Sequence, residues 1–260
     1  MSQIVVTING GVATVRLNDP ESMNALSVSM GAEFDSAMDA LVADTSIRAL
    51  VVTGTGRGFS AGGDVQAFYD NREAPQETMQ SILDGLHGSV SKLLKAPFPT
   101  IAAINGVVAG AGMGLAMATD LAVAVDSAVF TMAYTGIGVS PDGSSTFFLP
   151  RLVGTRRAME LILTNRVLSA SEALDLGMVN QVVPEGDFDA AVAKLAGRLA
   201  KGPTLAYVRA RELLTASFGN DPFTQMDAEA ASILAAASSN DFYEGISAFI
   251  EKRKPGFTGS

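Results

Sequence analysis

Cysteine is absent from the 260-residue sequence, and histidine occurs once, as His87. Without cysteine there are no disulfides, thiolate nucleophiles or cysteine-ligated metals, and a single histidine excludes a histidine-rich metal site. Basic residues are also few, 18 against 27 acidic ones, and the formal charge of −9 disfavours a sequence-independent grip on nucleic acid. We therefore expect no metal site and no nucleic-acid partner.

Long hydrophobic runs are missing as well. The first residues, MSQIVVTING, lack the basic and apolar regions of a secretion signal, and no stretch approaches the roughly 20 apolar residues of a membrane helix. The sequence does have apolar bulk, since 48% of its residues are hydrophobic and only 17% are charged. That is enough to bury a substantial core. We expect a globular, cytoplasmic protein with no membrane partner.

Alternating apolar residues near the start predict a β-hairpin. QIVVTI and VATVRL flank Asn9 and Gly10, a dipeptide that supplies the two positive φ angles of a type I′ turn. Ser27 is placed to cap a helix, and apolar residues at helical spacing predict a second helix over residues 75–95. Further strands or extended segments are predicted for apolar runs in the first two thirds, IRALVV, PTIAAI, LAVAV and VFTMAYTGIG, and for MVNQVV. The fold class is therefore α/β.

Helical composition dominates the end of the chain. From residue 201 it continues through PTLAYVRARELLTAS, FTQMDAEAASILAAAS and DFYEGISAFIEKRK. We therefore divide the chain into a core, residues 1–200, and a C-terminal helical region, residues 201–260.

Two glycine-rich segments, TGTGRGFSAGG and NGVVAGAGMG, each follow a predicted strand. Backbone N–H groups near Ala61 and Ala111 would have no partner within a helix, and together they could hold an oxygen that becomes negative during a reaction. The first segment also fits the dinucleotide fingerprint and the G-x-S-x-G motif of serine hydrolases. We favour neither, because a hairpin and a helix precede it and because His87 lies too soon after Ser60, inside a predicted helix.

Taken together, these segments resemble the crotonase, or enoyl-CoA hydratase/isomerase, superfamily. The resemblance covers nearly the whole chain and rests on LNDPESMNALS, TGTGRGFSAGGDV, PTIAAINGVVAGAGMGLAMATDLAVA, LPRLVGTRRAMELILTNRVLSASEALDLGMVNQVV and EGISAFIEKRKPGF. It implies a spiral of ββα units, a C-terminal helical region for assembly, and a homotrimer or a dimer of trimers. It also implies an acyl-CoA thioester substrate, with coenzyme A as part of the substrate and no separate cofactor.

The resemblance also implies where the substrate binds. The amides of Ala61 and Ala111 would hold the thioester oxygen. Contacts with coenzyme A are implied for two turns of the core and for two residues of the tail, the latter often reaching a neighbouring subunit: Asn24, Ala25, Leu26, Ala61, Gly62, Gly63, Asp64, Phe249 and Lys252.

Three positions decide which reaction is expected. The two glutamates of hydratases correspond to Gly114 and Tyr134; glycine cannot transfer a proton, and tyrosine, with a free pKa of about 10, is a poor base. Ordinary hydratase activity is therefore not expected. Asp142, within GVSPDGSST, matches the catalytic carboxylate of isomerases with a single aspartate, including the ring-epoxide isomerase of phenylacetate breakdown, and of 4-chlorobenzoyl-CoA dehalogenases. Without the resemblance, an aspartate after proline is most typical of a helix N-cap.

Three functions remain open. In an isomerase, Asp142 would move a proton between two carbons of an enoyl-CoA, and one carboxylate suffices for this. In a dehalogenase or hydrolase, Asp142 would attack an aryl carbon, His87 would activate water, and Tyr134 would lie beside the substrate. The third function is acyl-CoA binding without catalysis. We favour the isomerase, because a histidine at the edge of an apolar stripe is also typical of helix packing.

Overall fold

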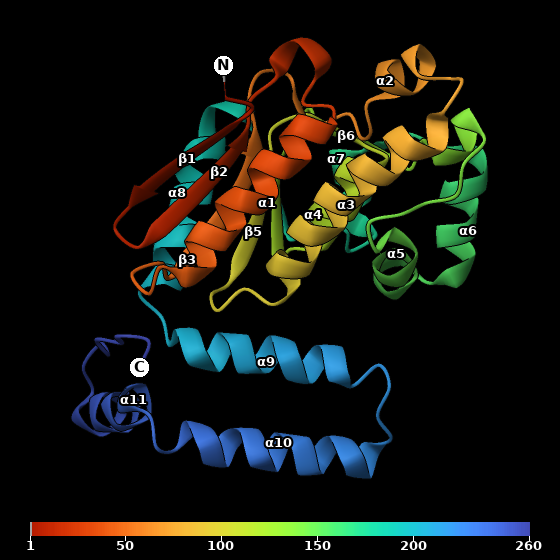
Figure 1. The fold of residues 1–260 in the computed structure, drawn as a ribbon. Coiled ribbons are helices and arrows are strands. Elements are labelled where there is room, and N and C mark those ends of the chain that lie inside the picture. The colour runs from red at the N-terminus through yellow and green to blue at the C-terminus, as the bar shows by residue number, and fades with distance from the viewer. Residues whose placement is uncertain (1) are drawn as a thin grey trace.

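The computed structural model describes residues 2–260, and its strands form two sheets (Figure 1). The larger sheet has six strands, ordered β1-β2-β3-β5-β7-β10, with the bounds Ile4–Asn9, Val12–Leu17, Ala49–Gly54, Thr100–Ile104, Leu121–Val125 and Gln181–Val183. The smaller sheet has four strands, ordered β4-β6-β8-β9, with the bounds Gly58–Ser60, Val107–Ala109, Val129–Thr131 and Leu168–Ser169. From β3 onward, successive strand pairs place one strand in each sheet. The predicted α/β class and the spiral of ββα units are confirmed.

Helices cover the sheets and connect the strands. Those of the core are α1 (Val28–Ala43), α2 (Val65–Asp70), α3 (Pro75–Leu94), α4 (Ala111–Met117), α5 (Ser145–Val153), α6 (Thr155–Thr164), α7 (Ala170–Asp175) and α8 (Phe188–Ala200). Short 3-10 helices span Pro20–Ser22, Tyr134–Ile137 and Glu185–Asp187. The predicted helix start is confirmed, because the Ser27 side chain accepts the Met30 N–H at 3.1 Å. The predicted helix over residues 75–95 is confirmed as α3.

Two local predictions are wrong. The hairpin turn consists of Gly10 and Gly11, with φ of 57° and 80°, because Asn9 continues the strand and pairs with Val12. The extended segment predicted for VFTMAYTGIG ends at Thr131. It is followed by a 3-10 turn, entered through a residue with positive φ, which redirects the chain toward α5.

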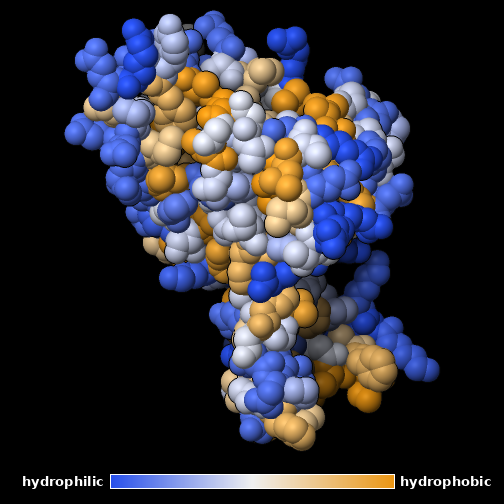
Figure 2. Space-filling model, turned by 90° about the vertical axis from the view of Figure 1, so that its right-hand side faces the viewer, coloured by the Kyte–Doolittle hydropathy of each residue, from blue (hydrophilic) through white to orange (hydrophobic). Residues whose placement is uncertain are grey.

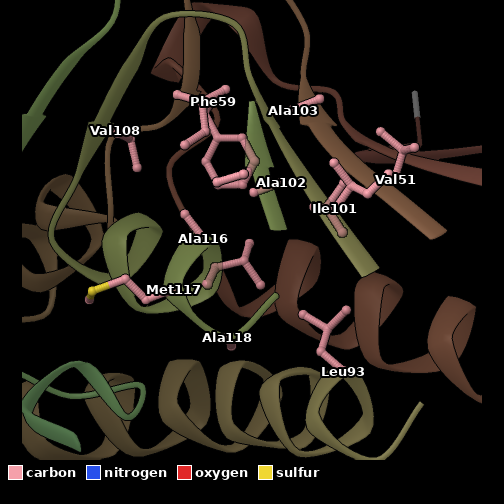
Figure 3. Close-up of a cluster of buried hydrophobic side chains, with 14 of the residues drawn as sticks. Val51, Phe59, Leu93, Ile101, Ala102, Ala103, Val108, Ala116, Met117 and Ala118 are labelled. Atoms are coloured by element: carbon pink, nitrogen blue, oxygen red, sulfur yellow. The ribbon is translucent and has the colours of Figure 1, made fainter. Parts of the chain in front are cut away.

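Buried apolar side chains fill the space between the strands and the helices. Figure 3 shows Phe59 of β4 beside Ala102 of β5, with Leu93 of α3 below them. These three side chains are almost completely inaccessible. The core therefore fixes the ends of β4 and β6, from which the two glycine-rich turns project.

The C-terminal helices lie below this core (Figure 1), and the first of them contacts it through Arg211, which donates to the Phe98 carbonyl oxygen at 3.2 Å and to Asp120 Oδ2 at 3.1 Å. They are α9 (Thr204–Ala216), α10 (Pro222–Ala236) and α11 (Asn240–Glu251). Arg48, just before β3, holds the connector to them: its side chain donates to the Gly202 carbonyl oxygen at 2.7 Å, to Thr204 Oγ1 at 2.6 Å and to the Thr258 carbonyl oxygen. Helix α8 ends at Ala200, and the division of the chain into two parts with separate functions stays a prediction.

Large apolar side chains of the C-terminal region are exposed to solvent. Figure 2 shows this region as a narrower lobe below the core, with hydrophobic residues gathered on it. Phe249 is 82% exposed, Phe223 75% and Leu234 73%. None of the helices among residues 2–260 combines the length and the hydrophobicity that a bilayer-crossing segment requires.

Candidate active site

Two turns that are distant in sequence lie side by side above the core. Leu26 and Gly63 form a parallel bridge, in which the Leu26 N–H donates to the Gly62 carbonyl at 2.6 Å and the Asp64 N–H donates to the Leu26 carbonyl at 3.3 Å. The structure thus brings together the two core segments for which coenzyme A contacts were predicted.

Gly62 is the point at which the two glycine-rich turns meet. Its φ is 95°, and a Cβ there would lie 2.9 Å from the Ala109 carbonyl oxygen and 3.2 Å from the Ala111 nitrogen. Because both obstacles are backbone atoms, no larger residue fits without displacing a turn. The absence of a side chain at this position is what allows the two sets of amides to approach each other.

Two amides of these turns, those of Gly63 and Ala111, are free. The Ala61 N–H is already used, since it donates to the Met23 carbonyl oxygen at 3.0 Å. By contrast, the N–H groups of Gly63 and Ala111 have no acceptor anywhere in residues 2–260. The Ala61 N–H is therefore not available as the predicted oxyanion donor, whereas the N–H groups of Gly63 and Ala111 are available to an outside acceptor.

Asn24 is fully occupied within the protein. Its Nδ2 donates to the carbonyl oxygens of Thr55 at 3.0 Å and Gly58 at 2.8 Å, and its Oδ1 accepts the Asp19 N–H at 2.9 Å. The residue is completely buried and has a φ of 58°. Its side chain is therefore not available for the predicted coenzyme A contact, whereas the neighbouring Ala25 is partly exposed.

Asp142 is held by Tyr134. The Tyr134 hydroxyl donates to Oδ1 of Asp142, and Oδ2 has no hydrogen-bond partner among residues 2–260. Only the backbone of Asp142 assists α5, since its carbonyl oxygen accepts the Ser145 N–H at 2.9 Å, while Ser144 occupies the N-cap position. The carboxylate is therefore not a helix cap. It is half-buried and presents one unpaired oxygen.

Tyr134 acts as a hydrogen-bond donor in this pair. The side chain is buried, and burial is the main cause that raises the pKa of Tyr134 far above its ordinary value. The negative charge of Asp142 and the hydrogen bond to it act in the same direction. The phenol therefore stays protonated over the whole working range of an enzyme and is not a base.

The loop that carries Asp142 is packed tightly between two helices. A Cβ added to Gly114 of α4 would lie 2.7 Å from the Gly143 carbonyl oxygen and 3.0 Å from Ser145 Oγ. On the other side, a Cβ at Gly143 would lie 3.4 Å from Leu86 of α3. Backbone atoms of the loop thus fill the space into which a side chain at position 114 would point. Gly143 and Ser145 escaped sequence analysis, because the packing that involves them is between distant segments.

Within residues 2–260, His87 does not pair with any other predicted site residue, and Phe249 and Lys252 lie far from the two turns. His87 is exposed and makes no hydrogen bond within the described residues, and its neighbour Leu86 is the one that packs on the Asp142 loop. Phe249 and Lys252 lie in and just after α11, at the opposite end of the molecule from α2 (Figure 1). Asp64 caps α2 by accepting the Ala67 N–H at 3.0 Å.

One hollow in the described surface lies away from these residues. It has a volume of about 640 Å³, lies between the β1–β2 hairpin and α8, and is lined by none of the predicted site residues. Nor do residues 2–260 contain a group of three or more histidine, aspartate or glutamate side chains that could hold a metal ion.

Known proteins resemble this chain in both sequence and fold. The family model for enoyl-CoA hydratase/isomerase matches residues 7–260. The chain is 37% identical over 260 residues to 1,2-epoxyphenylacetyl-CoA isomerase of Escherichia coli K12, covering 100% of this chain and 99% of that protein. It is 43% identical over 205 residues to 4-chlorobenzoyl coenzyme A dehalogenase-2 of an Arthrobacter species, covering 77% and 73% of the two chains.

A solved structure completes the comparison. The crystal structure of an enoyl-CoA hydratase from Polaromonas sp. JS666 superimposes with a TM-score of 0.93 at 34% identity, covering 98% of this chain and 99% of that one. Isomerases, dehalogenases and hydratases therefore all occur among its relatives. The match of the family model to nearly the whole length establishes that this chain belongs to the enoyl-CoA hydratase/isomerase family.

Proposed function

We propose that the protein isomerises the double bond of an enoyl-CoA, with Asp142 as its single proton carrier. The observation that carries the proposal is the asymmetric state of this carboxylate, in which Oδ1 accepts the Tyr134 hydroxyl and Oδ2 has no partner within residues 2–260. An unpaired carboxylate oxygen is able to accept a proton from carbon and to return it. The similarity to 1,2-epoxyphenylacetyl-CoA isomerase supports an isomerase and extends the candidate substrates to ring-derived acyl groups.

The proposed reaction has two proton transfers. Asp142 removes a proton from C2, between the thioester carbonyl and the 3,4 double bond, and the negative charge of the resulting dienolate moves to the thioester oxygen. The N–H groups of Gly63 and Ala111 donate to that oxygen, and one such donor is typically worth about 10²–10³ in rate. Asp142 then returns the proton at C4, so that the double bond lies between C2 and C3 and the carboxylate is regenerated.

Hydration is disfavoured by the same site. A hydratase needs carboxylates that position and activate water, whereas Gly114 carries no side chain and Tyr134 is a donor that keeps its proton. The backbone of Gly143 fills the adjacent space. This supports an isomerase within a family whose members include hydratases.

Dehalogenation of an aryl-CoA is the second candidate. The 43% identity to 4-chlorobenzoyl coenzyme A dehalogenase-2 favours it, and the unpaired Oδ2 of Asp142 is also suited to nucleophilic attack. His87 gives it less support, because it is exposed and has no partner within residues 2–260, whereas water activation needs a base held near the carboxylate. Acyl-CoA binding without catalysis is disfavoured by the unpaired carboxylate oxygen.

Assembly as a homotrimer or a dimer of trimers is part of the proposal. The exposed apolar side chains of α10 and α11 support it, because they would be buried against neighbouring copies. In such an assembly Phe249 and Lys252 would reach the coenzyme A of a neighbouring subunit, and Ala25, Gly63 and Asp64 would contact it within the chain. We propose no separate cofactor and a cytoplasmic location, which suits a protein without cysteine.

The test is conversion of a 3-enoyl-CoA, followed by the ultraviolet absorbance of the conjugated 2-enoyl thioester. Turnover by the purified protein, reduced about 10²- to 10⁴-fold in Asp142→Asn, is the expected result. Full activity of the variant would exclude the proton shuttle. If 3-enoyl-CoA is not converted, release of chloride from 4-chlorobenzoyl-CoA that depends on His87 would support the second candidate instead.

A further inference from the structure

The two oxygens of Asp142 are in different surroundings. Oδ1 accepts the Tyr134 hydroxyl, and Oδ2 has no partner within residues 2–260 and is not enclosed by protein. A carboxylate on a loop ordinarily rotates and exchanges its two oxygens. Here, rotation would break a charge-assisted hydrogen bond, which is among the stronger kinds in proteins.

Tyr134 is itself held in place. It is 8% exposed, its N–H donates to the Met132 carbonyl at 2.7 Å, and its own carbonyl accepts the Val139 N–H at 3.2 Å. Ala133 precedes it with a φ of 56°, a conformation that a non-glycine residue adopts only when its surroundings impose it. The donor that fixes Asp142 is therefore part of a rigid turn and not a mobile side chain.

Ser145 provides a second contact with this pair. Its side chain is completely buried, and its Oγ has no partner that meets hydrogen-bond geometry within residues 2–260. The hydroxyl nevertheless lies close enough to Tyr134 to act on its pKa, in the lowering direction. Because an unpaired buried hydroxyl is unfavourable, a small rotation that lets it donate to the Tyr134 oxygen would satisfy it.

We propose that Tyr134 is a positioning residue that confines proton transfer to Oδ2 of Asp142, and that Ser145 supports the Tyr134 hydroxyl. This inference rests on the proposed isomerase function. The same oxygen then takes the proton from C2 and returns it to C4, on the same face of the substrate. A proton held on one fixed oxygen, over which the substrate lies, returns to carbon faster than it exchanges with water.

The test follows a labelled proton. A 3-enoyl-CoA with two deuterium atoms at C2 is converted in ordinary water, and mass spectrometry measures how much deuterium appears at C4. We expect the wild type to transfer part of the label. Tyr134→Phe keeps the ring but loses the hydrogen bond to Asp142. We therefore expect kcat to fall about 10- to 100-fold, the fraction of deuterium transferred to C4 to drop, and KM to stay within about threefold.

Two further variants make the result specific. Ser145→Ala is expected to lower the transferred label in the same direction, with a fall in kcat of about 2- to 10-fold. Tyr69→Phe is the matched control, since it removes the hydroxyl of a tyrosine that is 64% exposed, and it should leave both readouts unchanged. Melting curves verify that each variant is folded.

The outcomes distinguish failure of the proposed isomerase function from failure of the positioning role of Tyr134. If Asp142→Asn is as active as the wild type, the proposed function fails. If the wild type transfers label and Tyr134→Phe transfers just as much at an unchanged kcat, the shuttle stands and the positioning role of Tyr134 is overturned. Wild-type turnover that depends on Asp142 but transfers no label would also overturn the positioning role, because the proton would then exchange despite the hydrogen bond from Tyr134.

Discussion

Replacing Gly114 with alanine tests whether close packing of the Asp142 loop is needed for activity. The added Cβ would lie 2.7 Å from the Gly143 carbonyl oxygen, so this backbone atom has to move by roughly 0.7 Å to reach an ordinary contact of about 3.4 Å. Overpacking of this kind typically costs about 1–3 kcal/mol. Near 260 residues, that corresponds to a fall in Tm of about 2–12 °C.

Activity should suffer more than stability. A displacement of about 1 Å at a reacting group can cost about 10²-fold, because proton transfer to carbon needs a close and aligned donor. We therefore expect Gly114→Ala to lose about 10- to 100-fold in kcat, measured as formation of the conjugated thioester, while the protein remains folded. Gly114→Glu should be still less active and should not gain hydration, because the larger side chain displaces the loop further.

A matched control isolates the effect of position from that of losing a glycine. Gly197 lies within α8 and has no atom within 4 Å of an added Cβ, so Gly197→Ala should leave activity unchanged and stabilise the helix by up to about 1 kcal/mol. Wild-type activity in Gly114→Ala would refute the reasoning, since the loop would then tolerate the displacement.

Two further predictions concern the C-terminal region. Arg48→Ala removes hydrogen bonds to Gly202 and Thr204, so trypsin should cleave after residue 201 at least about tenfold faster, while Arg48→Lys gives a smaller change. Arg253 lowers the pKa of Glu244 to about 2 from 4.5, so this contact is complete above pH 4.5 and is lost as the pH falls toward 2. Pepsin cleavage within residues 253–257 should increase as the pH falls from 4.5 toward 2. In Glu244→Gln, the cleavage rate should not change with this titration.

Local patterns predicted the helices well. Ser27 caps α1 and the apolar spacing of residues 75–95 gives α3, because both features depend on atoms within a few residues of each other. The hairpin turn was displaced by one residue, since Asn9 is drawn into the strand by its pairing with Val12. Register across strands is a non-local property, and a turn motif alone does not determine it.

At the candidate active site, too, local sequence patterns do not determine which distant segments make contact. The sequence identified the glycine-rich turns, but which amide is free depends on the bridge between Leu26 and Gly63 and on the use of the Ala61 N–H by Met23. Similarly, the sequence identified Tyr134 and Asp142 separately. Their hydrogen bond arises only because the intervening residues form a 3-10 turn and a loop, and neither structure has a strong local signal.

Because α10 is exposed in the single chain, the fraction of α10 that is folded is expected to depend on the protein concentration. None of its residues is buried against residues 2–260, and an isolated helix of this length is marginal in water. Under the proposed assembly, the free energy that orders α10 comes from association, so the ordered fraction rises with protein concentration by mass action. In a cell that makes little of this protein, the core would be folded while α10 is frayed. Raising the protein concentration would then increase the assembled fraction more than proportionally.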